Sequence, residues 1–101
     1  MDLRVADAPD EERYVASAGD EVVGFAEYRM RPELIAFVHT EVDGCTKGQG
    51  VGSKLIGFAL DDARSRGLAV LPFCPFVNGY IERHREYADL VPEPYRERFG
   101  L

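Results

Sequence analysis

The sequence predicts an α+β fold, in which an antiparallel β meander is joined to a β-α-β crossover and a C-terminal helix. Three observations predict it. Three β-prone segments follow one another, a glycine-rich loop leads into an amphipathic helical pattern, and a short apolar strand pattern precedes a helix that begins with proline. A chain of 101 residues is expected to form a single domain over residues 1–101.

The meander begins with a predicted hairpin. Residues 12–18, ERYVASA, alternate in polarity, a Gly-Asp turn follows, and residues 22–30 are rich in β-prone side chains. A turn containing proline leads into residues 34–42, LIAFVHTEV. This segment is apolar on both faces until His39, so it suits a central strand.

The crossover helix is predicted over residues 51–66. Its apolar side chains fall in two neighbouring rows at helical spacing and make one stripe, namely Val51, Leu55, Ile56, Ala59, Leu60 and Ala63. Gly67 marks its end. Residues 68–74 are typical of a short strand, and Pro75 opens a second helix that is predicted to run through residue 91.

The composition excludes several function classes. A net charge of −6 argues against non-specific binding of nucleic acid, which needs a basic surface. No apolar tract could span a bilayer, and the N-terminus lacks the apolar core of a signal peptide, so we expect a cytoplasmic protein with no membrane partner. Residues 1–43 carry eleven acids and four bases, whereas residues 44–101 carry seven acids and eight bases, so an anionic ligand would belong to the second half.

The segment KGQGVGS, residues 47–53, carries the strongest functional signal. It lies between a buried strand and an amphipathic helix, where unpaired N–H groups at the helix start attract anions and glycines let a phosphate approach. The spacing fails the nucleoside-triphosphate loop, because the lysine follows the serine, and it fails the dinucleotide fingerprint. It matches the pattern [RQ]-x-x-G-x-[GA], with Lys47 first. A turn without a ligand is the alternative, although such a turn needs only one or two glycines.

These residues resemble the acyl-coenzyme A loop of the GNAT superfamily of N-acetyltransferases. Three further segments are similar to a short, stand-alone GNAT-like family: HTEV (His39 to Val42), CPFV (Cys74 to Val77) and H-x-E-Y (His84 to Tyr87). The similarity covers about residues 22–91. Two positions depart from it, since Lys47 replaces the usual arginine or glutamine and Arg85 stands where proline is expected, but neither change removes a backbone donor.

The resemblance implies a minimal GNAT-like fold that binds acetyl-CoA and transfers its acyl group to an unidentified amine. It implies that the strand backbone near Val42 pairs with the pantetheine arm and that loop amides hold the pyrophosphate. The expected donor-binding residues are Val42, Lys47, Gly48, Gln49, Gly50, Gly52 and Ser53, with Asn78 added from the first turn of the second helix. No metal ion is expected.

Cys74 is the first candidate for chemistry. A residue before proline is held extended, and Pro75 begins a helix, so the thiol would sit at a helix N-terminus, where the thiolate is favoured. The alternative is an inert, buried cysteine. The thiol could form an acyl-enzyme, protonate the leaving thiolate or only touch the thioester, and the sequence does not choose among these.

His39 and Glu41 are the other candidates. They alternate with their neighbours on the predicted strand, so both should point to one face. A histidine is the natural base near neutral pH, and a carboxylate beside it could orient the ring. The alternative is a hydrogen-bonded core histidine with a charge at the rim.

The acceptor site is expected to be open. Larger GNAT enzymes, which this chain resembles only from the hairpin onward, carry a helical pair after the first strand and further strands after the last helix. Here the segment DAPDEE leaves no room for such a pair, so the site would be incomplete or supplied by a partner or a second copy in a homodimer. A non-catalytic acyl-CoA sensor or adaptor, and a scaffold that uses the acidic half for a protein partner, remain alternatives.

Overall fold

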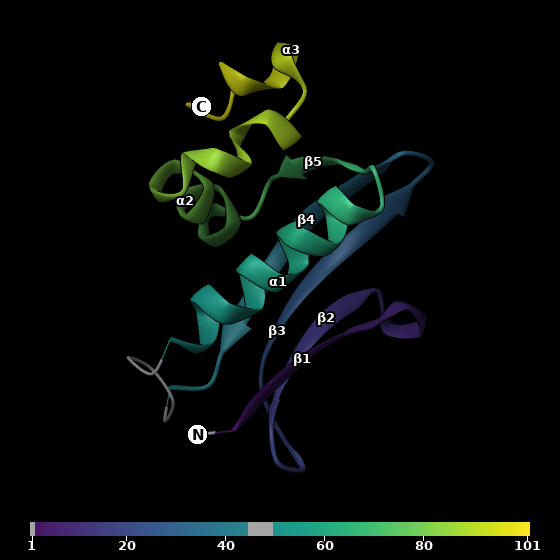
Figure 1. The fold of residues 1–101 in the computed structure, drawn as a ribbon, viewed down its shortest axis with the longest axis vertical. Helices are drawn as coiled ribbons and strands as arrows, with labels where there is room; N and C mark the ends of the chain where they lie inside the picture. The colour runs from purple at the N-terminus through teal and green to yellow at the C-terminus, as the bar shows by residue number, and fades with distance from the viewer. Residues whose placement is uncertain (1, 45–49) are drawn as a thin grey trace.

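A five-stranded mixed sheet forms the centre of the molecule (Figure 1). The computed structural model describes residues 2–44 and 50–101. The strands are β1 (Leu3–Ala8), β2 (Arg13–Ala18), β3 (Glu21–Arg31), β4 (Leu34–Val42) and β5 (Ala69–Pro72). They lie in sequence order, with β1 to β4 antiparallel and β5 parallel to β4. This confirms the predicted fold class, a meander joined to a β-α-β crossover.

The long helix α1 (Val51–Ser65) lies across one face of the sheet and contacts every strand (Figure 1). All six residues of the predicted apolar stripe are buried, so the helical periodicity identified the core-facing side correctly. Further helical segments are η1 (Pro9–Glu11), α2 (Pro75–Arg83), η3 (Arg85–Leu90) and α3 (Glu93–Arg96). Within the described residues, no helix is long and apolar enough to cross a membrane.

Three aromatic rings fill the core between α1 and the sheet. The ring of Tyr14 lies 5.3 Å from that of Tyr28 and 6.2 Å from that of Phe37, measured between centroids. All three side chains are buried, and tilted or edge-on pairs of this kind add to the stabilisation from area burial. The two phenols need hydrogen-bond partners at this depth, and each finds a carboxylate at the edge of the core.

Strand β1 is the strand that the sequence did not predict. Leu3 and Val5 pack against the core, as an alternating strand requires. The third residue on that face is Asp7, which accepts a hydrogen bond from the Tyr28 hydroxyl at 2.6 Å and pairs with Arg66 at 3.4 Å. A carboxylate is tolerated there only because of these partners, which are distant in the sequence.

The second helix is shorter than predicted, so that boundary was wrong. It ends at Arg83, and His84 leaves the helical conformation with φ −128° and ψ 75°. The next residues form η3, where the Arg64 guanidinium of α1 donates to the carbonyl of Glu86 at 2.8 Å and pairs with Asp89 at 2.9 Å. Because of these contacts with α1, the chain does not continue as one helix after Arg83.

The C-terminal segment is not a free polar tail. Phe99 and Leu101 pack against the core, and the ring of Phe99 lies edge-on to that of Phe73 at 5.4 Å. The Arg98 guanidinium covers both rings, at 5.7 and 5.8 Å from their centroids. The segment therefore folds back over the end of β5 and the start of α2.

Candidate functional site

The parallel strands β4 and β5 stop pairing halfway along β4. Their register ends at Phe37 and Pro72, and the N–H of Cys74 donates to the Phe37 carbonyl at 2.9 Å. Strand β4 continues to Val42, so its second half has no partner from β5. Since Pro72 has no N–H, it cannot extend the ladder. This edge of β4 is available to pair with another extended group.

A β-bulge in β4 decides which residues face α1. Tyr28 lies opposite Phe37, whereas the preceding residue of β3 lies opposite His39, so Val38 is an extra residue in β4. Beyond the bulge, Thr40 points to the helix-covered side of the sheet, as Phe37 does.

Cys74 lies beside this stretch of β4 at the start of α2. It occupies the N-cap position with extended φ −71° and ψ 123°, and Pro75 begins the helix, as the sequence predicted. The thiol donates to the Thr40 hydroxyl oxygen at 3.4 Å, and the residue is only 4% exposed. The structure therefore holds a buried thiol at a helix N-terminus, next to the open edge of β4.

His39 and Glu41 share one face, but it is the face opposite to Thr40 and Cys74. Nε2 of His39 lies 3.1 Å from Oε2 of Glu41, and both side chains are exposed. The ring of Phe25 lies 6.0 Å from the imidazole. Because neighbouring residues of a strand point to opposite faces, the three expected catalytic residues do not form one cluster. Strand β4 separates the thiol from the His39–Glu41 pair.

The first turn of α1 presents N–H groups that have no partner within the helix. Gly50 is the N-cap residue, with φ 78° and ψ 14°, a left-handed conformation that favours glycine. Its carbonyl accepts the N–H of Lys54 at 3.0 Å. Ser53 is exposed on this turn. The geometry suits an anion placed before the helix.

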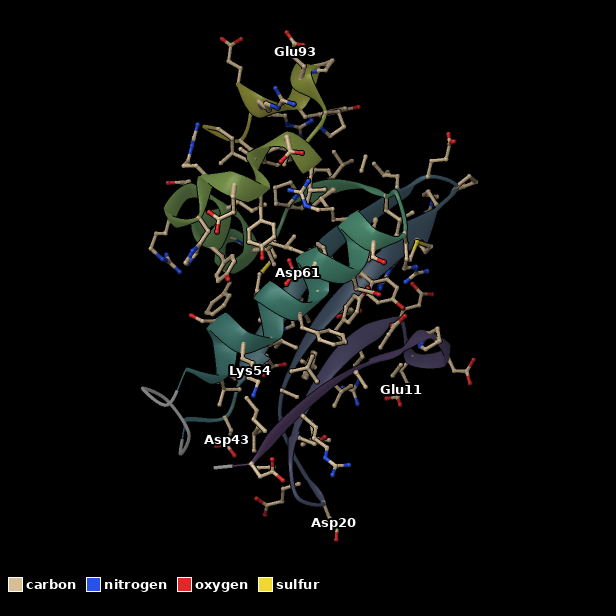
Figure 2. All side chains as sticks on the ribbon, viewed as in Figure 1. Glu11, Asp20, Asp43, Lys54, Asp61 and Glu93 are labelled. Carbon is tan, nitrogen blue, oxygen red and sulfur yellow. The ribbon has the colours of Figure 1, made fainter. Side chains whose placement is uncertain are left out.

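The connection from β4 to α1 contains the other expected donor-binding residues. Val42 ends β4, and Figure 2 labels Asp43, which follows it, and Lys54 of α1. Lys47, Gly48 and Gln49 lie outside the described residues, so their contact with a pyrophosphate stays a prediction.

Close packing against α2 explains the glycine at position 52. A Cβ atom there would lie 2.4 Å from Cζ of Phe76, so only glycine admits the ring against the first turn of α1. A Cβ at Gly57 would lie 3.0 Å from the Tyr80 hydroxyl. These two glycines let α2 approach α1 closely, which brings together the first turns of the two helices.

Asn78 is engaged by the C-terminal segment. Its Nδ2 donates to the carbonyl of Phe99 at 3.0 Å and lies 3.5 Å from a carboxylate oxygen of Glu82. Its Oδ1 is buried and accepts no hydrogen bond within the described part of the chain. The Asn78 amide oxygen, near the start of α2, can therefore accept a hydrogen bond from a donor that the described residues do not supply.

Three aromatic side chains after Cys74 come together although no continuous helix carries them. The Tyr80 ring stacks on His84 at 4.1 Å and lies 6.0 Å from Tyr87. The Tyr87 hydroxyl donates to Asp61 at 2.7 Å, and this hydrogen bond, with partial burial, raises the pKa of Tyr87 to about 12. The phenol keeps its proton at neutral pH.

Thr40, whose hydroxyl accepts from the thiol, was not among the residues predicted for the site. Because Thr40 stands between His39 and Glu41, the alternation of a strand puts it on the opposite face. This alternation does not show which residue the Thr40 side chain contacts. Over residues 2–44 and 50–101, no group of three or more His, Cys, Asp or Glu side chains could hold a metal ion.

Comparison with known proteins shows similarity to one described family and to a solved structure. A family model described as GCN5-related N-acetyl-transferase matches residues 13–90. The chain is also similar to an NMR solution structure of a GCN5-like protein from Staphylococcus aureus, described as a candidate N-acetyltransferase. The identity is 25%, the TM-score is 0.69, and the match covers 89% of this chain and 88% of that one.

Proposed function

Because this chain belongs to the GCN5-related N-acetyltransferase family, we propose that it is an acetyl-CoA-dependent N-acyltransferase acting on an amine acceptor. One observation carries the proposal: β4 parts from β5 between two helix N-termini, and a buried thiol lies beside the gap. The whole chain would act as one acyl-CoA-binding domain, in the cytoplasm, where such a thiol stays reduced.

The donor would bind along the open edge of β4 and the start of α1. The extended pantetheine arm would pair with the β4 backbone near Val42, as an added strand does. The pyrophosphate would accept from the first amides of α1, at Gly50, Gly52 and Ser53, together with Lys47, Gly48 and Gln49. The buried Oδ1 of Asn78 supports this assignment, because residues 2–44 and 50–101 give it no donor and the pantetheine arm carries amide N–H groups.

Cys74 would be the residue nearest the thioester. In a covalent route, its thiolate attacks the thioester carbonyl, the bond from that carbon to the coenzyme sulfur breaks, and the coenzyme thiolate leaves with the proton that Cys74 gave up. The amine then attacks the Cys74 thioester, which restores the thiol. The hydroxyl of Thr40, 3.4 Å from Sγ, would hold the thiol in place.

His39 and Glu41 would deprotonate the amine acceptor from the other face of the sheet. A neutral imidazole takes the proton of an incoming ammonium group, and Glu41, at 3.1 Å, steadies the ring that becomes charged. The division of the site by β4 suits two substrates that approach from opposite faces.

A non-catalytic acyl-CoA sensor or adaptor is the second candidate. The observation that favours it is that the side chains of His39 and Glu41 are exposed, so the described residues do not enclose an acceptor at this pair.

The test is a mass spectrum of the chain mixed with acetyl-CoA, followed by measurement of thiol release against a panel of amines. Acetylation at Cys74 and amine-dependent release would support the enzyme and the covalent route. Cys45→Ser is the matched control, since it removes the other cysteine. A non-covalent complex without release would favour the sensor, and absence of any complex would refute both.

A further inference from the structure

The ring of Phe76 lies between the two parts of the proposed donor site. Residues 50–53 begin α1, and Cys74 stands at the start of α2. The Phe76 ring reaches from α2 to Gly52, where its Cζ, Cε1 and Cε2 atoms lie 2.4, 3.1 and 3.5 Å from the position of an added Cβ atom. Because Cζ is the nearest of these atoms, the ring points end-on at α1 and spans the space between the two helix starts.

Helix packing alone does not account for the exposure of this ring. Phe76 and Tyr80 stand one turn apart on the side of α2 that meets α1 (Figure 1), and a glycine of α1 admits each of them. Tyr80 is 8% exposed, as expected of a residue between two helices, whereas Phe76 is 42% exposed. The contact of Phe76 also requires glycine in the first turn of α1, where alanine would be the better helix former. The chain therefore holds an apolar ring with its outer surface open to a bound molecule.

The direction in which a donor would run follows from the positions of the amides and the thiol. The diphosphate of coenzyme A carries adenosine at one end and the pantoyl group of the pantetheine arm at the other. Since the thioester is assigned to Cys74, and Cys74 and Phe76 belong to one turn of α2, the pantetheine end points toward α2. The first branched group beyond the diphosphate on that side is the pantoyl carbon, which carries two methyl groups.

We propose that Phe76 recognises the two methyl groups of the pantoyl unit, an inference that rests on the proposed function. Because the ring is held against Gly52, it lies next to the amides that would bind the diphosphate, and its exposed surface is apolar. Contact with the methyl groups removes apolar surface of both partners from water. Phe76 thus selects donors that carry pantetheine over other diphosphates, which amides at a helix start do not distinguish.

Phe73 is the matched control for this role. It is the same residue type, lies just before Cys74 and is 46% exposed. Its ring, however, lies edge-on to that of Phe99 at 5.4 Å, and the Arg98 guanidinium stands 5.7 Å from its centroid. Phe73 therefore packs with the C-terminal segment, whereas Phe76 packs with the first turn of α1.

The test is an NMR titration with dephospho-coenzyme A and with ADP, two ligands that differ only in the pantetheine arm. Phe76→Ala should weaken the affinity for dephospho-coenzyme A about tenfold and that for ADP less than about twofold. Phe76→Leu keeps an apolar side chain, so both affinities should stay within about threefold of those of the unchanged chain. Phe73→Ala should change neither affinity more than about twofold.

Equal losses for the two ligands in Phe76→Ala would overturn the proposal, because the ring would then support the α1 amides or contact adenosine. Unchanged affinity for dephospho-coenzyme A in that variant would also overturn it, while leaving the proposed function intact. If the unchanged chain binds neither coenzyme A nor dephospho-coenzyme A, both the proposal and the proposed function are refuted.

A measurement on the unchanged chain decides the matter if Phe76→Ala unfolds. In the complex with coenzyme A, nuclear Overhauser effects should connect the ring protons of Phe76 with the two pantoyl methyl signals. A complex that forms without these effects would refute the contact.

Discussion

The ring of Phe76 rests where the side chain of any residue other than glycine would stand at Gly52, with Cζ 2.4 Å from the position of a Cβ atom. Phe76 is 42% exposed, so this is a contact at the surface rather than in the core. It ties the first turn of α2, which carries Cys74, to the first turn of α1. This contact therefore helps to join the two halves of the proposed donor site.

We predict that Gly52→Ala destabilises the chain, although alanine is the better helix former by about 1 kcal/mol. The added methyl group must displace the Phe76 ring. In a Phe76→Ala background the same substitution should stabilise, so the sign should reverse. Urea denaturation of the four chains measures this coupling, which we expect to be about 1 kcal/mol or more. Equal effects in both backgrounds would show that the contact has no energetic role.

We predict that Gly50→Val weakens coenzyme A binding at least about tenfold, because valine is disfavoured at φ 78° and distorts the first turn of α1. Gly19→Val is the matched control. Gly19 has φ 62° in the turn between β2 and β3, and at neither position does an atom of the described residues lie within 4 Å of an added Cβ. Both variants should lose similar stability, but only Gly50→Val should lose affinity in calorimetry. Equal losses of affinity in the two variants would mean that the loss comes from general destabilisation of the fold and not from the first turn of α1.

We predict that Tyr14→Phe costs about 1.5 kcal/mol of stability, because the buried phenol donates to Asp62 at 2.6 Å and the variant leaves that carboxylate one donor short. Tyr95→Phe should change stability by less than about 0.5 kcal/mol, since the Tyr95 hydroxyl makes no hydrogen bond within residues 2–44 and 50–101. Chemical denaturation compares the two. A cost below that of the control would contradict the assigned hydrogen bond.

We predict that stability falls as the pH rises above about 10. Folding raises the pKa of Tyr87 from 10.0 to about 12, first through its hydrogen bond to Asp61. Burial, followed by hydrogen bonds to Asp62 and Asp7, raises the pKa values of Tyr14 and Tyr28 above their ordinary value as well. The unfolded chain therefore loses these protons first, so the stability that is complete below about pH 10 declines through about pH 12.

Denaturation curves at increasing pH check this sign, and Tyr87→Phe should flatten the decline. A decline that is equally steep in the variant would show that Tyr87 does not contribute to it.

The fold class was predictable because its signals are local. The α1 stripe is a matter of helical spacing, and the turns and β-prone runs lie within a few residues of one another. Strand β1 was not predictable, because one of its core-facing residues is Asp7, which is acceptable there only with Tyr28 and Arg66 beside it. The early end of α2 likewise depends on the contacts of Arg64 with η3.

The local positions of the candidate site residues could be predicted, but their arrangement could not, and their roles stay predictions. The position of Cys74 at a helix start followed from the proline after it. Its separation from His39 and Glu41 follows from the alternation of a strand, and its contact with Thr40 depends on the bulge at Val38, which leaves no mark in the sequence. Glycine spacing predicted a ligand at Gly52, which stays a prediction, and the structure adds a packing role, since Phe76 lies against this glycine.

The most direct measurement is an NMR titration of the labelled chain with acetyl-CoA. If the chain binds an acyl donor between β4 and the two helix N-termini, the resonances of Val42, Gly50, Ser53 and Cys74 should shift together and saturate. Spectra that stay unchanged at millimolar acetyl-CoA, or that change only at residues distant from these four, would contradict the account.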